Sequence, residues 1–317
     1  MRVLITGGAG FIGRALASRW RSAHPGIWLG AVDTAPMGWN GFGAFDEVTS
    51  CCFSAPAGLA AAKGADVIVH LAAQTTVQGS VLDPALTWDE NVCKTMALLE
   101  VLRRQNPGAH LIFASTGGAI AGDHDGPVNE ATLPRPLSPY GASKLAVEGL
   151  LSAYAGSFDL TATALRFANV YGPGSGDKTS VIAAFCRAIR DRAPLEIRGD
   201  GEQSRDFIHV DDICDAIIAA ARGRCGGVFQ LGSGQGTSIS QLAALMAEIA
   251  PWPVAIARLP GLSGEVRHNR ADIALAEAAL KFRPKVPLAI GLAETLGWFL
   301  SEFEAAPRPA VGLRQAG

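Results

Sequence analysis

The chain of 317 residues is 49% hydrophobic and 18% charged, which excludes a disordered chain and suffices to build one large domain or two ordinary ones. Lysine and arginine total 27 against 29 aspartates and glutamates, a net charge of −2 that argues against nucleic acid or an anionic membrane as the main partner. Apolar runs are too short for a membrane span, which needs about 18 residues, and glycines from Gly7 onward interrupt any signal-peptide core, so we expect a cytoplasmic protein.

Short apolar runs alternate with helical patterns in the first half of the chain. Buried parallel strands are continuous apolar runs, and helices are their usual crossovers. The alternation predicts an α/β protein with a Rossmann-type doubly wound parallel sheet. The expected strands are Val3–Thr6, Ile27–Asp33, Asp66–Ala72, His110–Ser115 and Leu160–Phe167.

Helices are predicted from the spacing of apolar residues. The strongest pattern covers Thr87–Gln105, with acidic residues near its start and arginines near its end, as the helix dipole favours. After Phe167 the pattern loosens into a smaller mixed α/β unit, which begins with a glycine- and proline-rich loop at Tyr171–Lys178. Further helices are expected at Ser180–Arg190, Asp211–Arg222 and Ser238–Ile249.

The six cysteines and six histidines form no recognisable metal-binding pattern. There is no C-x-x-C pair, Cys51 and Cys52 are adjacent, and no histidines are paired at metal-ligand spacing. We therefore expect free thiols in a reducing compartment and no metal site.

A glycine-rich turn follows the first expected strand. Gly7, Gly10 and Gly13 allow the backbone to approach a pyrophosphate, whose charge the following helix N-terminus stabilises. Asp33 lies 20 residues after Gly13, at the end of the second strand. An acid there accepts hydrogen bonds from the adenosine ribose and repels a 2′-phosphate, so the pattern predicts NAD rather than NADP.

A second signal, Ser138-Pro139-Tyr140-Gly-Ala-Ser-Lys144, opens a predicted helix. Ser138 can cap the helix, Pro139 suits its first turn, and Tyr140 and Lys144 share one face. A free tyrosine has a pKa near 10, which the Lys144 ammonium and a positive nicotinamide ring would lower. Tyr140 could then take a proton from a sugar hydroxyl while a hydride leaves the same carbon.

Five segments stand out in order along the chain. They are Thr-Gly-Gly-Ala-Gly-Phe-Ile-Gly (6–13), Asp-Val-Ile-Val-His-Leu-Ala-Ala (66–73), Ser-Pro-Tyr-Gly-Ala-Ser-Lys (138–144), Leu-Arg-Phe-Ala-Asn-Val-Tyr-Gly-Pro (165–173) and Gly-Asp-Gly-Glu-Gln-Ser-Arg-Asp-Phe-Ile-His-Val-Asp-Asp (199–212). Together they resemble the extended short-chain dehydrogenases/reductases, and more narrowly the NAD-dependent nucleotide-sugar epimerase/dehydratase family of the UDP-glucose 4-epimerase type. The resemblance runs from residue 1 to about 300 and fixes no substrate.

The resemblance implies a set of site residues. Tyr140 would be the base, Thr116 the catalytic hydroxyl with Ser115 as second choice, and Lys144 the partner that tunes the tyrosine and holds the nicotinamide ribose. His70 is expected to pack rather than to act. The other cofactor-binding residues would be Gly7, Gly10, Phe11, Ile12, Asp33, Cys52, Phe53, Leu71, Ala72, Ala73, Asn91 and Phe167. The substrate-binding residues would be Thr75, Thr116, Asn169, Arg205 and Arg267.

Several positions depart from the family pattern. The catalytic hydroxyl is expected five residues before Gly122, where this chain has Gly117, and a neighbouring tyrosine is replaced by Ala121, which should reshape the sugar pocket. No Asp-Glu pair follows Thr116, so dehydration is disfavoured. Cys52 stands where the family usually has an acidic residue that contacts the adenine amino group. Leu262 stands where a second diphosphate-binding arginine is common. Arg267 or Arg258 would substitute, unless both are ordinary surface residues.

The resemblance also implies a domain division and an assembly. Residues 1–167, with a returning segment near 207–232, would form the NAD-binding domain, 168–304 mainly the substrate domain, and 305–317 a loose tail. A homodimer would form through the Thr87–Gln105 and Tyr140–Ala155 helices.

Our leading hypothesis is a nucleotide-sugar epimerase that inverts C4 of a UDP-hexose through a transient 4-keto sugar. One alternative is an NAD(H)-dependent oxidoreductase of a keto-sugar or sugar alcohol, which would change NADH stoichiometrically. A more remote one is a non-catalytic NAD-sensing protein, which predicts a damaged tyrosine–lysine pair. Fold alone does not decide among them.

Overall fold

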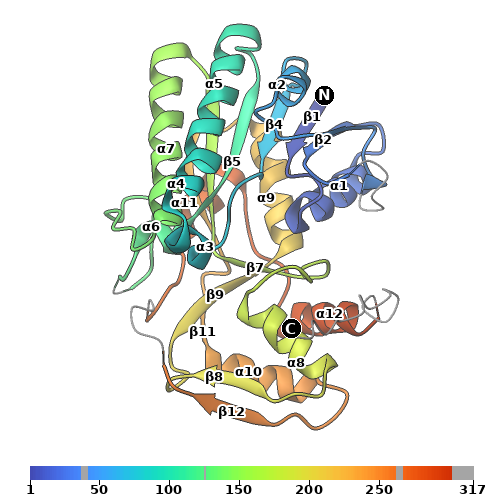
Figure 1. Cartoon of the computed structure of the whole chain (residues 1–317), viewed down its shortest axis with the longest axis vertical. Coiled ribbons are helices and arrows are strands. Elements are labelled where there is room, and N and C mark those ends of the chain that lie inside the picture. The colour runs from blue at the N-terminus through green and yellow to red at the C-terminus, as the bar shows by residue number, and fades with distance from the viewer. Residues whose placement is uncertain (37–41, 125, 262–266, 302–317) are drawn as a thin grey trace, which may run out of the picture.

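The computed structural model describes residues 1–36, 42–124, 126–261 and 267–301. The expected tail at 305–317 and Leu262 lie outside these residues. In Figure 1 a larger unit built on one sheet stands above a smaller unit that contains β8, β12, α8, α10 and α12. No helix among the described residues is long and apolar enough to cross a membrane.

The larger unit is a doubly wound parallel sheet, as the sequence predicts. In the described part of the chain it has seven strands in the order β10-β6-β5-β4-β1-β2-β3, all paired in parallel. The order reverses between β1 and β4, so the loops that follow these two strands meet at one edge, where such sheets bind ligands. The strands are β1 (Arg2–Thr6), β2 (Trp28–Asp33), β3 (Glu47–Ser50), β4 (Val67–His70), β5 (His110–Thr116), β6 (Thr161–Phe167) and β10 (Gly227–Leu231).

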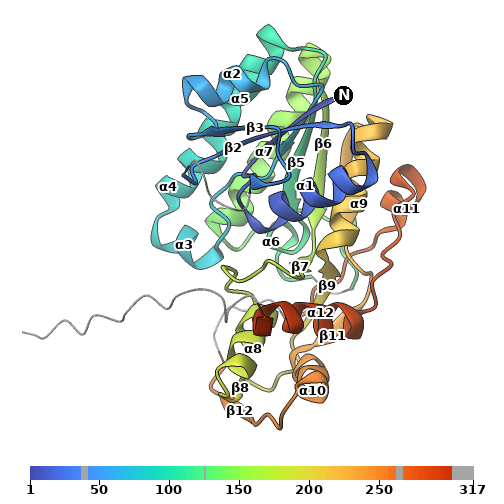
Figure 2. The same ribbon diagram turned by 90° about the vertical axis from the view of Figure 1, so that its right-hand side faces the viewer.

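Helices cover both faces of this sheet because its strand side chains alternate between two apolar cores (Figure 2). On β1, Val3 and Ile5 join the core shared with α1 (Phe11–Ala23), α9 (Val210–Gly223) and α11 (Ala274–Leu280). Leu4 faces the opposite core. The helices of that core are α2 (Pro56–Ala62), α5 (Lys94–Gln105) and α7 (Pro139–Phe158).

The helix expected at Thr87–Gln105 starts earlier and contains a π-helical turn. After α3 (Val77–Leu82), the Asp83 side chain accepts a hydrogen bond from Leu86 N at 2.9 Å and begins α4 (Pro84–Trp88). The π segment η2 (Asp89–Cys93) then leads into α5. The inserted residue of a π turn changes which side chains point inward, and such turns cluster at functional sites.

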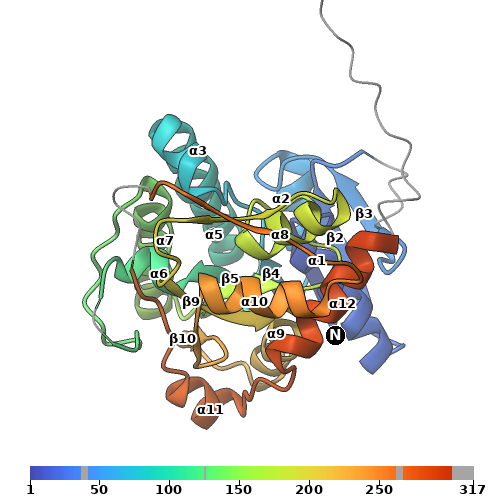
Figure 3. The ribbon, with the colours of Figure 1, turned by 90° about the horizontal axis from the view of Figure 1, so that it is seen from below.

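The smaller unit combines helices with two short sheets (Figure 3). The expected helix at Ser238–Ile249 is α10, which begins with a capping box formed by Ser238 and Gln241. The helices are α8 (Val181–Arg190), α10 (Ile239–Ile249) and α12 (Leu288–Ser301). The strands are β7 (Asn169–Tyr171), β8 (Leu195–Arg198), β9 (Ser204–His209), β11 (Gly236–Ser238) and β12 (Ile256–Leu259).

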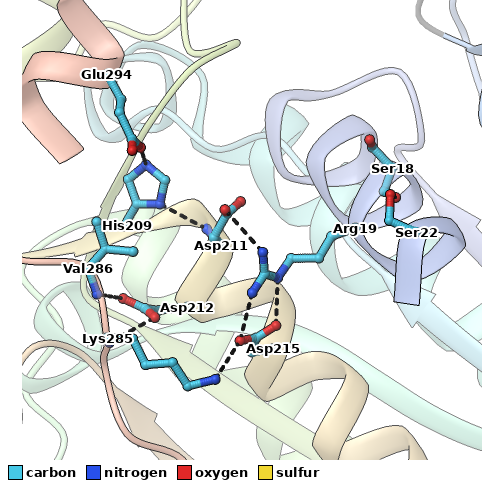
Figure 4. A network of polar contacts seen from close by, with 10 residues as sticks. All are labelled: Ser18, Arg19, Ser22, His209, Asp211, Asp212, Asp215, Lys285, Val286 and Glu294. Carbon is cyan, nitrogen blue, oxygen red and sulfur yellow. Dashed lines mark hydrogen bonds and ion pairs between the residues drawn. The ribbon is translucent and has the colours of Figure 1, made fainter. Parts of the chain in front are cut away.

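Ion pairs join α1, α9 and the segment that leads to α12 (Figure 4). Arg19 of α1 forms a two-point pair with Asp215 of α9, at 2.6 and 2.9 Å, and Lys285 pairs with the same carboxylate at 3.0 Å. His209, which caps α9, lies 3.6 Å from Glu294 of α12. These contacts hold the last helix against the larger unit.

Candidate active site

The glycine turn packs closely against the loop that follows β4. Gly7 has φ of +74°, and a Cβ atom there would lie 2.8 Å from the backbone nitrogen of Ala72. Gly13 is equally constrained, since its Cβ would lie 2.5 Å from the carbonyl oxygen of Gly7. Gly10, by contrast, has only that carbonyl nearby, at 3.2 Å. The turn is therefore tight on the protein side and open at Gly10.

Helix α1 begins at Phe11, and no side chain caps its first backbone N–H groups. Uncapped amides at a helix N-terminus are suited to bind phosphate oxygens. The side chains of Phe11 and Ile12 pack into the core, so these residues would meet a pyrophosphate through their backbone.

Asp33 ends β2 and holds the glycine turn. One carboxylate oxygen accepts a hydrogen bond from Ala9 N at 2.9 Å, and the other accepts one from Ala35 N at 2.9 Å. A carboxylate can accept about four hydrogen bonds, so capacity for ribose hydroxyls is left. The same negative charge disfavours a 2′-phosphate.

A buried asparagine connects the loop after β4 to the tyrosine helix. Asn91, in η2, accepts from Gln74 N at 2.8 Å and donates to Gln74 O at 3.0 Å and to Ser143 Oγ at 2.9 Å. Ser143 in turn donates to the carbonyl of Tyr140 at 2.8 Å. The loop after β4, in which Leu71, Ala72 and Ala73 are expected to line the cofactor, is thereby connected to the helix that carries Tyr140.

His70 belongs to a hydrogen-bond chain inside the protein. Its Nδ1 lies 2.6 Å from Thr6 Oγ1 and its Nε2 lies 2.9 Å from Thr95 Oγ1, which donates to Asn91 O at 2.6 Å. Burial lowers the pKa of His70 to about 3, so the ring is neutral. Both ring nitrogens are engaged in hydrogen bonds inside the protein, which agrees with the structural rather than catalytic role expected from the sequence.

Two other expected cofactor contacts lie after β3. Cys52 Sγ lies 3.3 Å from Ser54 Oγ, and Phe53 is buried with its ring against His70, at 4.6 Å between centroids. Neither side chain is an acid, so no carboxylate comes from this turn. All six cysteines are free thiols.

Tyr140, Thr116 and Lys144 come together where β5 meets α7. Ser138 Oγ caps α7 by accepting from Gly141 N at 3.1 Å, with Pro139 in the first turn, as expected. The Thr116 hydroxyl hydrogen-bonds to Tyr140 and lowers its pKa. Lys144 donates to Ala114 O at 2.8 Å, and its Nζ lies 5.9 Å from the centre of the Tyr140 ring.

Burial dominates the pKa of Tyr140 in the protein alone. It raises the pKa to about 12, and this effect outweighs the hydrogen bond from Thr116. Lys144 is buried as well, which lowers its pKa to about 7 and weakens its ammonium as a source of positive charge. Desolvation therefore opposes both charged forms, and the expected lowering of the Tyr140 pKa depends on the positive nicotinamide ring as well as on Lys144.

Ser115, the second choice for the catalytic hydroxyl, points elsewhere. It is buried and donates to Glu148 Oε1 at 2.5 Å. Glu148 also forms a buried two-point ion pair with Arg166 of β6, at 2.7 and 2.9 Å. Successive strand residues face opposite sides, so Thr116 is the hydroxyl directed to Tyr140.

Close neighbours explain why glycine follows Thr116. A Cβ at Gly117 would lie 2.5 Å from Gln230 Oε1, and one at Gly118 would lie 1.8 Å from Asn269 Nδ2. The two glycines open the short helix α6 (Gly117–Ala121), in which Ala121 is buried. Asn269 therefore reaches the end of β5 from the C-terminal part of the chain, and no sequence motif predicts this contact.

Two of the expected diphosphate ligands, Asn169 and Arg205, lie on β7 and β9, and β7 begins two residues after Phe167, which pairs with Thr116. Asn169 donates to Asp206 O at 3.1 Å, and Arg205 donates to Ser204 O at 2.9 Å. Arg267 instead forms an exposed ion pair with Asp200, at 2.6 Å, and Arg258 donates to the carbonyl of the same aspartate.

Thr75 is exposed in the loop after β4, two residues beyond Ala73, and Phe167 is buried at the end of β6. Four further residues of the site were not identified from the sequence, namely Ser143, Glu148, Arg166 and Asn269. For Glu148 a signal existed, since it lies four residues after Lys144 on the same face of α7.

The family of this chain follows from comparison with known proteins. Residues 3–232 match the NAD dependent epimerase/dehydratase family. The chain belongs to this family. It is thus an NAD-dependent enzyme by family, which agrees with the glycine turn and Asp33.

Individual relatives and solved structures are similar to this chain over nearly its whole length. A UDP-glucose 4-epimerase of Mycolicibacterium smegmatis is 34% identical over 310 residues, which cover 94% of this chain and 98% of that protein. A UDP-glucose 4-epimerase of Thermotoga maritima, solved with UDP-glucose, has a TM-score of 0.87 and 32% identity over 96% of this chain and 100% of that one. The Thermus thermophilus enzyme, solved with NAD, has a TM-score of 0.86 and 31% identity over 95% and 99%.

Proposed function

We propose that this protein is an NAD-dependent nucleotide-sugar epimerase that inverts C4 of a UDP-hexose through a transient 4-keto sugar. The observation that carries the proposal is the meeting of Tyr140, Thr116 and Lys144 beside a glycine turn suited to NAD. The 4-epimerase names of the relatives agree with it.

The residues at the sheet edge fit NAD. The space beside Gly10, the uncapped start of α1 and the spare acceptor capacity of Asp33 provide for its pyrophosphate and adenosine ribose. When bound, NAD supplies reversible hydride acceptance from a sugar carbon. Lys144 would hold the nicotinamide ribose, with Leu71–Ala73 as the wall and Phe167 beside the nicotinamide.

Tyr140 would act as the general base on the sugar 4-hydroxyl, with Thr116 bridging the two. Burial keeps the phenol protonated in the protein alone, since its pKa is raised to about 12. Positive charge near the ring must therefore offset the desolvation, and Lys144 in its protonated form supplies part of it. On return, the hydride would add to the opposite face of the C4 carbonyl carbon, and the same phenol would give its proton back to the oxygen on C4.

The substrate diphosphate would be bound by Asn169 and Arg205, which lie on neighbouring strands. Arg267 would assist only after leaving Asp200, with which it pairs. Thr75 would contact the sugar from the loop after β4. Arginine is suited to the task because its planar fork matches phosphate oxygens.

The test is a panel of UDP-, dTDP-, GDP- and CDP-sugars, with products separated by chromatography and NADH followed by absorbance. We expect conversion of a UDP-hexose to its C4 epimer with no stoichiometric change in NADH. Steady consumption or production of NADH would instead indicate a net oxidoreductase.

We also propose a homodimer through the outward faces of α5 and α7. Met96 of α5 is exposed, and a Cβ atom at Gly149 or Gly156 of α7 would have no neighbour within 4 Å, so a partner helix could approach closely. A monomer in sedimentation at micromolar concentration would contradict this.

The proposed division of labour assigns NAD binding to 1–167 with the return at 207–232, and mainly substrate binding to 168–304. That return contains α9, which packs on α1, and β10, which pairs with β6. We place the protein in the cytoplasm because its six thiols are free.

A further inference from the structure

A buried carboxylate of β9 lies where the two units join. Asp206 is fully buried, and within the described ranges of the chain its carboxylate contacts neutral donors and no cation. Oδ1 accepts from Ser233 N and Ser233 Oγ, both at 2.7 Å. Oδ2 accepts from Gly234 N at 3.0 Å and from Ala271 N at 3.1 Å. An unpaired buried charge is unfavourable, so this carboxylate keeps its donors in place.

The donors come from two other parts of the chain. Ser233 and Gly234 belong to the turn between β10 of the main sheet and β11 of the smaller unit. The turn packs closely on the carboxylate, since a Cβ atom at Gly232 would lie 2.5 Å from Asp206 Oδ2. In Figure 1 β9 itself runs from the smaller unit toward the main sheet. Asp206 therefore links the end of the main sheet to a strand of the smaller unit.

The C-terminal segment that contains Ala271 runs beside β9 and is fixed there by the same carboxylate. Ser204 N of β9 donates to Arg267 O at 2.9 Å, and Asn269 N donates to Ser204 O at 3.2 Å. Two residues further on, Ala271 N donates to the side chain of Asp206 instead of a β9 carbonyl. The carboxylate thus sets the register of the segment whose Asn269 side chain reaches the end of β5.

The main chain of Asp206 lies beside the proposed diphosphate ligands. Arg205 precedes it on β9, and Asn169 of the neighbouring strand β7 donates to its carbonyl oxygen at 3.1 Å. The segment held by its carboxylate leads to the end of β5, where Thr116 hydrogen-bonds to Tyr140. Asp206 therefore connects the diphosphate end of the proposed substrate site with its sugar end.

We propose that Asp206 is a positioning residue, which holds the diphosphate ligands of β7 and β9 in register with the segment that carries Asn269. The proposal rests on the proposed function and deepens it, because Asp206 acts through these residues and is itself buried. The role needs a carboxylate. Each oxygen accepts two hydrogen bonds, so an amide NH2 in place of either oxygen would lose two of them and face two donors.

The experiment compares the NAD-loaded wild type with Asp206→Asn and with the matched control Asp212→Asn. Asp212 of α9 is also buried, and its carboxylate accepts from Lys285 N at 2.9 Å and from Val286 N at 3.2 Å, in the segment before α12. Both variants should lose stability in urea unfolding. Below the unfolding transition, Asp206→Asn alone should raise the KM for UDP-glucose and the calorimetric Kd for UDP, each about tenfold or more, with copurifying NAD unchanged.

The comparison separates positioning from a purely structural role. Wild-type KM and UDP affinity in Asp206→Asn would overturn the proposal, and so would equal rises in both variants. If Asp206→Asn does not fold, Ser233→Ala decides, because it removes one of the hydrogen bonds and keeps the backbone donor. It should raise KM about threefold, and an unchanged KM would overturn the proposal.

The two measurements also distinguish this proposal from the proposed function. A wild type that binds UDP without epimerising UDP-glucose would overturn the proposed function alone, and the UDP affinities of the variants would still decide the role of Asp206. A wild type that binds no UDP would overturn both.

Discussion

Replacing Glu148 with glutamine should destabilise the protein more than the same kind of replacement at an exposed carboxylate. Glu148 and Arg166 have only 5% and 6% of their side chains exposed, and the pair is joined by two short hydrogen bonds. Removing one partner of such a pair leaves the other charge buried and costs about 3–5 kcal/mol. Glutamine still accepts from Ser115 and Arg166, so we expect a loss of about 3 kcal/mol.

The assay is urea unfolding of wild type, Glu148→Gln and the control Glu100→Gln, whose carboxylate pairs with arginines on the surface of α5. Surface pairs contribute little, so the control should shift the transition far less. The same Glu148 variant should lower the pKa of Lys144 further and move the alkaline limb of activity to lower pH, because the negative charge of Glu148 raises that pKa. A Glu148→Gln protein as stable as wild type would refute the inference that Glu148 and Arg166 form a buried, desolvated ion pair.

Three further predictions concern single positions. Gly7→Ala should abolish the binding of NAD that copurifies with the protein, because φ at Gly7 is +74° and the new Cβ would lie 2.8 Å from Ala72 N. The control Gly64→Ala, whose Cβ would have no neighbour within 4 Å, should retain NAD. The measurement is chromatography of the nucleotide released from each purified variant. Thr116→Ala should lower kcat by about 100-fold, while Ser115→Ala should keep most activity and lose stability, and the reverse result would exchange their roles. The pKa of His70 is about 3 in the folded protein against about 6.5 unfolded, so the unfolded chain binds the extra proton between these values and stability falls as pH falls through that window. His70→Gln should flatten this slope in urea unfolding at pH 7, 5.5 and 4, and an unchanged slope would contradict the assignment.

The sequence predicts the strands that are apolar throughout and misses those that are not. β1, β2, β4, β5 and β6 fall where continuous apolar runs place them, within a few residues at their ends. β3 is Glu-Val-Thr-Ser and half-exposed, and β10 is Gly-Val-Phe-Gln-Leu, which begins with a glycine and is interrupted by a glutamine, so neither has a continuous apolar run to identify it. The π turn at Asp89–Cys93 has no sequence signature either.

The candidate site is predictable where chemistry depends on spacing along the chain. This holds for Tyr140 and Lys144, which share one face of α7, and for Asp33, which is the last residue of β2. The charge balance of the site is not predictable in this way, because it depends on burial and on charges from other elements, namely Lys178 in the loop after β7 and Arg166 of β6. Burial raises the pKa of Tyr140 to about 12 in the protein alone, and the spacing of residues along the chain does not show this.

The most direct test of the epimerase account uses UDP-glucose that carries deuterium at C4, incubated with the NAD-loaded protein. The account predicts UDP-galactose that retains the label at C4, no accumulation of NADH, and loss of conversion in Tyr140→Phe. Label lost to the medium, NADH formed in step with product, or a fully active Tyr140→Phe protein would contradict it.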